Sequence, residues 1–220
     1  MIAELSEITP LALTLQPAPF SDPDWLFEVK HDGFRSLVYI QDECLLVSRK
    51  GNTYQRFKDL SRVLACVPHE VILDGELVCL DEEGQTLFHD LMFNRAPSHF
   101  YAFDILWLDG KDLRDRPLLK RKQILQAVVT ESPQRLLYVD RIEEQGEQLF
   151  ELICKRDMEG IVAKPKQSLY RGAGPPGSRS RIRTTRRRWA EGNCFIHPAM
   201  TLERAQEFPM TVLTAYNART

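Results

Sequence analysis

Residues 27–35 read Phe-Glu-Val-Lys-His-Asp-Gly-Phe-Arg, which combines a strand pattern with a cluster of charged groups. Side chains alternate between the two faces of a strand, so Glu28, Lys30 and Asp32 are expected on one face. The apolar residues between them are then expected to point to the core. A carboxylate two positions from a lysine can orient its amine, so the stretch predicts a strand that presents a lysine to a pocket.

The turn after this strand adds a cation to the predicted pocket. Gly33 permits a tight turn, which is expected to bring Arg35 back toward Lys30. A lysine attacks as the neutral amine, so a nucleophilic role needs its pKa lowered by burial or by nearby cations. A Lys-x-Asp-Gly motif alone is more often a strand end with a surface ion pair, so the rest of the sequence has to decide between the two interpretations.

Hydrophobic periodicity and turn residues place the remaining elements. Strands are expected at residues 25–30, 34–40, 44–47, 71–80 with an interruption at Asp74-Gly75, 100–108, 136–139 and 160–164. Helices are expected at residues 57–66, 89–93, 117–130 and 144–156, the third with Leu119, Ile124, Leu125 and Val128 inward. Many strands with few strand–helix–strand alternations predict an α+β fold with mainly antiparallel sheets.

Four short motifs follow Lys-x-Asp-Gly along the chain. They read Val-Ser-Arg-Lys-Gly-Asn at 47–52, Ile-Leu-Asp-Gly-Glu-Leu at 72–77, Phe-Tyr-Ala-Phe-Asp-Ile-Leu at 100–106 and Glu-Gly-Ile-Val-Ala-Lys at 159–164. In order and spacing they resemble the nucleotidyltransferase motifs of the ATP-dependent DNA ligases, RNA ligases and capping enzymes. The sequence is most similar to bacterial ligases related to the repair enzyme ligase D, over about residues 15–170.

This resemblance implies a fold and a reaction. The implied fold is the ligase adenylation domain, in which two antiparallel-rich sheets with flanking helices hold the nucleotide between them. The implied nucleophile is Lys30, which would attack the α-phosphorus of ATP in the presence of Mg²⁺, release pyrophosphate and carry a covalent lysyl-AMP. The implied partner is nicked double-stranded DNA, whose 5′-phosphate would receive the AMP in repair, recombination or replication.

The resemblance also implies roles for the other site residues. Glu28, Asp32, Arg35 and Lys164 would contact the nucleotide, Arg49 its ribose or phosphate, Glu76 the ribose or the metal, Phe103 the base, and Glu159 would bind Mg²⁺. Each match has a plain structural alternative. Asp-Gly pairs are ordinary turn signals, an isolated Phe is usually core, and isolated Glu or Arg side chains are usually solvated.

Charge is spread unevenly along the chain. Residues 1–170 hold 20 Lys and Arg against 28 Asp and Glu, a net charge of −8, whereas residues 171–220 hold nine Arg and three Glu, a net charge of +6. An acidic body lacks a strong electrostatic footprint for nucleic acid, so a local patch or another domain would have to contact DNA.

No run of about 18 apolar residues exists, and the N-terminus lacks a signal-peptide pattern. These features predict a cytoplasmic protein. The resemblance implies a bacterial one, and it is expected to be a monomer.

Three regions of the chain differ in amino-acid composition and pattern. Residues 1–24 are Pro-rich and read as an extended lead-in, residues 25–170 as the adenylation core, and residues 171–220 as a divergent tail without a pattern able to build a core. The family carries an OB-fold domain after the core, and the tail is too short to supply one. Nick sealing by this chain alone is therefore expected to be impaired.

The tail also lacks the last family motif, Trp-x-Lys-x-Lys, because no Lys follows Lys166. If the degenerate codon bases are chosen suitably, a frame that begins one base before the codon of Pro175 encodes Thr-Thr-Trp-Ile-Lys-Ile-Lys. This stretch falls where the family has the motif. The Arg-rich, Lys-free composition favours such a frameshift over the alternatives, a truly divergent tail or an Arg-rich nucleic-acid arm. In the present frame Arg179, Arg181 or Arg183 would have to replace the lysines, so weak or lost adenylation is expected.

Two other functions stay open. An RNA ligase or a capping guanylyltransferase would use the same motifs. A truncated pseudoenzyme or nucleotide-binding remnant would keep the cleft without the reaction. An NAD-dependent ligase is disfavoured, because its nicotinamide-binding domain has no room before Lys30.

Overall fold

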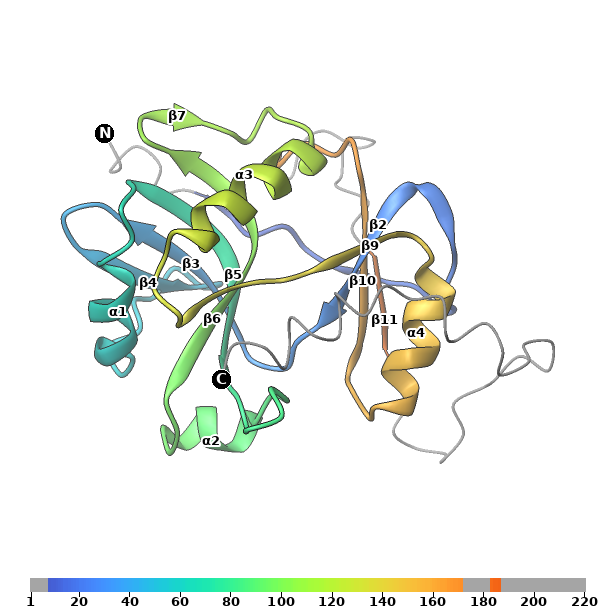
Figure 1. The fold of residues 1–220 in the computed structure, drawn as a ribbon, viewed down its shortest axis with the longest axis horizontal. Coiled ribbons are helices and arrows are strands. Elements are labelled where there is room, and N and C mark those ends of the chain that lie inside the picture. The colour runs from blue at the N-terminus through green and yellow to red at the C-terminus, as the bar shows by residue number, and fades with distance from the viewer. Residues whose placement is uncertain (1–7, 172–182, 187–220) are drawn as a thin grey trace.

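A computed structural model describes residues 8–171 and 183–186 of the chain (Figure 1). The strands are β1 (Thr14–Leu15), β2 (Asp22–Lys30), β3 (Phe34–Ile40), β4 (Cys44–Ser48), β5 (Val71–Cys79), β6 (Ser98–Leu108), β7 (Lys111–Asp112), β8 (Leu136–Tyr138), β9 (Arg141–Glu144), β10 (Gly160–Pro165) and β11 (Arg183–Arg186). The helices are α1 (Lys58–Leu64), α2 (Phe88–Phe93), α3 (Leu118–Thr130) and α4 (Gly146–Lys155). No helix in this part of the chain is long and apolar enough to cross a bilayer.

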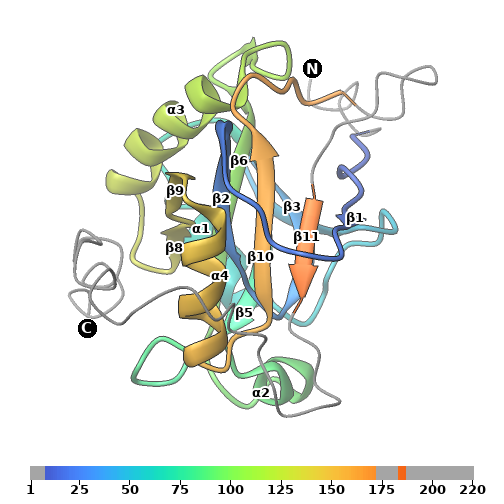
Figure 2. The same ribbon diagram turned by 90° about the vertical axis from the view of Figure 1, so that its right-hand side faces the viewer.

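The strands form two sheets, which confirms the predicted α+β class. A five-stranded sheet has the order β1-β11-β10-β2-β9, and a six-stranded sheet has the order β4-β3-β5-β6-β7 with β8 beside β6. The pairings are antiparallel except β1 with β11 and β6 with β8. Figure 2 shows β2 and β10 side by side, with β11 beyond β10.

Each sheet has its own apolar core. The larger core lies under the six-stranded sheet, where α1 contributes Leu60 and Leu64 and α3 contributes Leu125. The smaller core joins Phe27 of β2 to Leu149 of α4. The buried residues of these helices follow the i, i+3, i+4 spacing of an amphipathic helix. A third cluster joins the two sheets, because it packs Leu37, Ile72 and Leu106 of the six-stranded sheet with Val162 of β10.

The strand expected at 71–80 does not break at Asp74-Gly75. β5 runs through both residues, and only its register with β6 shifts between them. A side chain at position 75 would meet the carbonyl oxygen of Tyr101 at 2.4 Å. Gly75 therefore allows a close approach of two strands, and the predicted interruption was wrong.

The prediction also missed or misplaced other parts of the fold. The helix expected at 144–156 begins at Gly146, because residues 141–144 extend the five-stranded sheet as β9. In α3 the buried side chains include Arg121 and Lys122, whereas Leu119 and Ile124 are only partly buried.

The segment predicted to be a divergent tail contains one strand, β11, that its composition did not indicate. This strand pairs with β10, and its residues Thr184 and Thr185 are buried. The other residues affected by the proposed frameshift lie outside the described residues.

Candidate active site

A small cavity between the two sheets contains most of the predicted site residues. Its volume is about 70 Å³. In the five-stranded sheet, Lys30 of β2 lies opposite Gly160 of β10, and Glu28 lies opposite Val162. This antiparallel register places Glu28, Lys30 and Val162 on one face. The cavity is lined by Glu28, Lys30, Arg35, Asp74, Glu76, Phe103, Asp104, Val162, Lys164 and Tyr170, among others.

The predicted nucleophile is paired with the predicted metal ligand. Nζ of Lys30 lies 2.5 Å from Oε2 of Glu159, and the two side chains are 15% and 19% exposed. Lys30 ends β2 and Glu159 precedes β10, so the pairing of these strands brings the groups together. The amine is reachable from solvent, but it must lose both its proton and this carboxylate partner before it can attack an electrophile.

Glu28 lies deeper in the same cavity, between two lysines. Its Oε1 lies 2.8 Å from Nζ of Lys122, and its Oε2 contacts Nζ of Lys164. All three residues are buried. Burial lowers the pKa of Lys164, the nearby Lys122 acts in the same direction, and Glu28 opposes both. Buried charges need partners of this kind, so the group is a closed ionic cluster.

Phe103 presents its ring to two cations. Nζ of Lys164 lies 4.4 Å from the ring centroid, and Cζ of Arg35 lies 5.1 Å from it. Both distances fall within the range of cation–π contact. The ring is half-buried and lines the cavity, as a ring that stacks on a base would have to.

Arg35 is fixed by a buried carboxylate. Its Nε and Nη2 donate to the two oxygens of Asp74 at 3.0 and 2.7 Å. The hydroxyl of Tyr170 donates to Asp74 Oδ2 at 2.7 Å. Burial opposes the charge of Arg35, but Asp74 more than offsets this and raises the pKa of the guanidinium above its ordinary value. The bidentate pair orients Arg35 toward the cavity.

The carboxyl of Glu76 has a pKa well above its ordinary value. Burial raises its pKa to about 8, with Asp74 and Glu159 acting in the same direction. Lys30 and Arg35 act in the opposite direction. At neutral pH the carboxyl is therefore largely protonated, and it becomes an anion only when a cation or a higher pH removes the proton.

The turn after Lys30 is shaped by two close contacts. A side chain at Gly33 would meet the carbonyl oxygen of Leu77 at 2.1 Å, so this glycine lets the turn press against β5. His31 stacks on Tyr101 with centroids 4.1 Å apart. Burial and then the neighbouring Lys30 lower the pKa of His31 to about 3, so its ring is neutral at physiological pH. These contacts attach the Lys30 strand end to the six-stranded sheet.

Three predicted site residues, Asp32, Arg49 and Glu159, do not line the cavity, although Glu159 contacts Lys30, which does. Asp32 lies beyond the end of β2 and is exposed, so it does not share the strand face of Lys30 as expected. Arg49 is exposed in the turn after β4. The sequence analysis missed Asp74, Asp104 and Tyr170, which line the cavity, and Lys122, which pairs with Glu28. For Lys122 a signal existed, because this basic residue falls on the apolar stripe of its helix.

Glu76 and Glu159 are carboxylates that could hold a Mg²⁺ ion beside Lys30. They lie close enough for the charge of Glu159 to raise the pKa of Glu76. No cluster of three or more His, Cys, Asp or Glu side chains suited to a metal exists among residues 8–171 and 183–186. Mg²⁺ is commonly held by one or two carboxylates together with substrate phosphates and water, so two protein ligands are sufficient.

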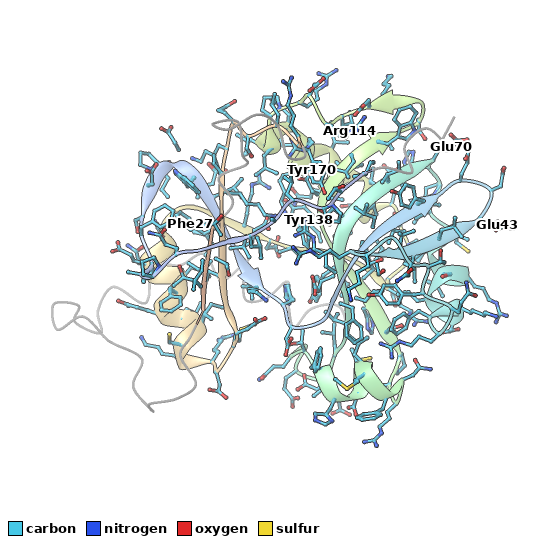
Figure 3. All side chains as sticks on the ribbon, turned by 180° about the vertical axis from the view of Figure 1, so that it is seen from behind. Phe27, Glu43, Glu70, Arg114, Tyr138 and Tyr170 are labelled. Atoms are coloured by element: carbon cyan, nitrogen blue, oxygen red, sulfur yellow. The ribbon has the colours of Figure 1, made fainter. Side chains whose placement is uncertain are left out.

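A larger cavity, with a volume of about 470 Å³, shares Val29 and His31 with the smaller one. Lys30 and Glu76 line the smaller cavity and not the larger one. Tyr138 belongs to the wall of the larger cavity and, like Tyr170, lies near the middle of the molecule between the sheets (Figure 3). The charged groups that could act on a phosphate therefore face the smaller cavity.

Comparison with known proteins agrees with this geometry. A family model described as ATP dependent DNA ligase domain matches residues 12–181, and the chain belongs to this family. It is 38% identical over 171 residues to the multifunctional non-homologous end joining protein LigD of Mycolicibacterium smegmatis, covering 74% of this chain and 21% of that protein. It is 34% identical over 159 residues to LigD of Pseudomonas aeruginosa, covering 67% and 19%. The chain thus spans about a fifth of these curated relatives.

Solved structures show the same fold. A mycobacterial DNA ligase D complexed with ATP and MES superposes with a TM-score of 0.69 at 29% identity, covering 82% of this chain and 60% of that one. The Chlorella virus DNA ligase-adenylate gives a TM-score of 0.55 at 17% identity, covering 81% and 67%, and supports the fold alone. The predicted family and the ligase adenylation fold are therefore confirmed.

Proposed function

We propose that this chain is the adenylating part of an ATP-dependent DNA ligase. Nζ of Lys30 attacks the α-phosphorus of ATP. An N–P bond forms, the bond to the pyrophosphate oxygen breaks, and the amine loses its proton. AMP then passes to the 5′-phosphate of nicked double-stranded DNA, as part of nick sealing in repair. The observation that carries the proposal is the Lys30–Glu159 pair, which lies at a cavity that Glu76 and Phe103 also line.

The other residues position the reactants. The ring of Phe103 stacks on the base, and Arg35 and Lys164 supply positive charge to the phosphates. Glu159 and Glu76 hold Mg²⁺, which neutralises charge that develops on the phosphate oxygens when it is bound. Little covalent work beyond the lysine is required, because phosphoryl transfer depends mainly on positioning and electrostatics.

The reaction is expected to be weak in this chain, because the sequence has no Lys after Lys166. We infer that a frameshift near Pro175 removed the motif whose lysines hold the α-phosphate. The nucleotide sequence of codons 172–220 tests this directly. The inference fails if the frame one base earlier does not encode Trp-Ile-Lys-Ile-Lys.

The same absence of lysines favours a second candidate, a nucleotide-binding remnant that no longer reacts. Incubation with α-labelled ATP and Mg²⁺ separates the candidates. A labelled protein band that disappears in Lys30→Ala supports the ligase assignment, and a band that survives this change contradicts it. Binding of ATP without labelling identifies the remnant, and labelling from GTP rather than ATP identifies a capping guanylyltransferase.

A further inference from the structure

Lys122 is, like Asp74, a fully buried charged group beside the candidate site. Nζ lies 2.8 Å from Oε1 of Glu28, donates to the carbonyl oxygen of Val139 at 2.7 Å and lies 4.2 Å from the ring centroid of Tyr138. The contact with Val139 is a hydrogen bond, that with Glu28 is an ion pair, and that with Tyr138 is a cation–π contact. Lys122 is therefore held from three sides.

Lys164, the other cation on Glu28, is held differently. Its ammonium contacts Glu28 Oε2 and lies 4.4 Å from the ring centroid of Phe103. A base that stacks on this face of Phe103 has to occupy the space where the ammonium now lies. Nucleotide binding therefore requires Lys164 to move away from the ring, toward the phosphates that it can neutralise.

When Lys164 moves, Lys122 becomes the remaining cation on Glu28. A buried carboxylate without a positive partner is costly. With Lys122 in place, the Glu28 carboxylate keeps one ion pair and with it one orientation.

Helix α3 binds the residue next to Phe103 as well as the carboxylate of Glu28. Arg121, next to Lys122, donates to both oxygens of Asp104 at 2.7 and 2.9 Å. Asp104 follows Phe103 on β6, and Glu28 lies on β2 of the other sheet. Two consecutive residues of α3 thus bind one carboxylate from each sheet, which fixes Phe103 and Glu28 relative to one another.

We propose that Lys122 is a positioning residue for base selection, acting through Glu28. An ionised carboxylate at the edge of the stacked base accepts a hydrogen bond from the exocyclic amine of adenine. It repels the carbonyl oxygen that guanine and hypoxanthine carry at the same position. Lys122 itself does not touch the nucleotide. The proposal rests on the proposed function, because it assumes that a purine nucleotide stacks on Phe103.

The test measures binding, so it does not depend on whether adenylation survives. Isothermal titration calorimetry in Mg²⁺ compares ATP with inosine triphosphate, which has the carbonyl in place of the amine. In Lys122→Met the preference for ATP is expected to fall by about tenfold or more, since a pocket built around a hydrogen bond loses discrimination when that bond is lost. In Lys120→Met, the same substitution at an exposed position of the same helix, the preference is expected to stay unchanged.

Lys122→Gln serves as a second variant in case Lys122→Met does not fold. Its amide can still donate to Val139 without carrying charge, and selectivity is again expected to fall. Circular dichroism and the unfolding temperature establish that each variant is folded. A folded Lys122 variant that keeps the full preference for ATP overturns the proposal and leaves the proposed function intact. Failure of the unaltered chain to bind ATP at all overturns both.

Discussion

The amine of Lys30 lies 2.5 Å from the carboxylate of Glu159, although 129 positions separate the two residues in the sequence. The contact exists because the end of β2 pairs with the start of β10. An ammonium held by a carboxylate is a poor nucleophile, so whatever draws Glu159 away also frees Lys30 to lose its proton. A cation that binds Glu159 would do so.

The first prediction concerns the reactivity of Lys30 in the absence of nucleotide. In Glu159→Gln the amide cannot pair with the ammonium as an ion, so acetylation of Lys30 by acetic anhydride should rise several-fold. Mass spectrometry of the Lys30 peptide measures this. The matched control is Glu143→Gln, which removes a surface partner of Lys166 and should leave Lys30 unchanged. Equal acetylation in both variants would show that Glu159 does not restrain the amine.

A second prediction uses the raised pKa of Glu76, about 8. A protonated carboxyl cannot coordinate a cation, so Mg²⁺ has to displace the proton below this pH. Apparent Mg²⁺ affinity should therefore rise between about pH 6 and pH 8, by at most about tenfold per pH unit, and level off above. Calorimetry at several pH values measures the rise, and Glu76→Gln should remove it.

The same titration separates the two roles considered for Glu76. A carboxyl that contacts only a ribose hydroxyl can do so in either protonation state, and the Mg²⁺ affinity would then not follow its titration. Glu82→Gln, an exposed acidic position that lines neither cavity, is the control and should keep the pH dependence. A flat profile in the unaltered chain would assign Glu76 to the ribose and leave Glu159 as the metal ligand.

The third prediction concerns stability rather than catalysis. Asp74 is fully buried between Arg35 and Tyr170. Arg35→Met leaves that carboxylate with one hydroxyl donor and should cost about 3 kcal/mol of unfolding free energy. Tyr170→Phe removes a single hydrogen bond and should cost about 1–2 kcal/mol. Urea unfolding at neutral pH measures both.

The control for this prediction is an ion pair of the same type on the surface. Arg114 pairs with Asp112, and the two side chains are 35% and 42% exposed. Arg114→Met should therefore cost less than about 1 kcal/mol. If Arg35→Met were no more destabilising than Arg114→Met, the buried pair of Arg35 and Asp74 would contribute no more to stability than a surface pair. It would then not be what holds β3, β5 and the segment after β10 together.

Much of the fold and site could be predicted because the relevant signals are local. The strand at residues 34–40 was predicted with its observed ends, since alternation and turn residues mark them. Lys30, Glu28, Glu76, Phe103 and Glu159 could be grouped because each belongs to a short motif whose order along the chain resembles that of a known family.

What the sequence could not show depends on contacts between distant segments. The position of Lys122 on the apolar stripe of its helix indicates burial, but it does not indicate that the partner is Glu28 of the other sheet. Gly75 looks like a turn until the backbone of β6 is found against it. Asp32 follows the motif spacing but lies past the strand end, where alternation no longer fixes its direction. For Arg49 the resemblance implies a nucleotide contact, but the residue lies in an exposed turn that does not bring it to the cavity.

The last prediction tests the frameshift at the level of the protein. Shifting the frame by one base before the codon of Pro175 should replace the Arg-rich stretch by Thr-Thr-Trp-Ile-Lys-Ile-Lys and restore two cations for the α-phosphate. Two charge-assisted contacts made mainly in the transition state are each worth about 2–3 kcal/mol, so labelling of Lys30 by ATP should rise by at least about 100-fold. Replacing both restored lysines by Met in the corrected chain is the matched control and should return labelling to the original level. If the corrected chain labels no better than the present one, the missing motif is not what limits adenylation, and the defect lies in the cleft around Lys30 and Glu159.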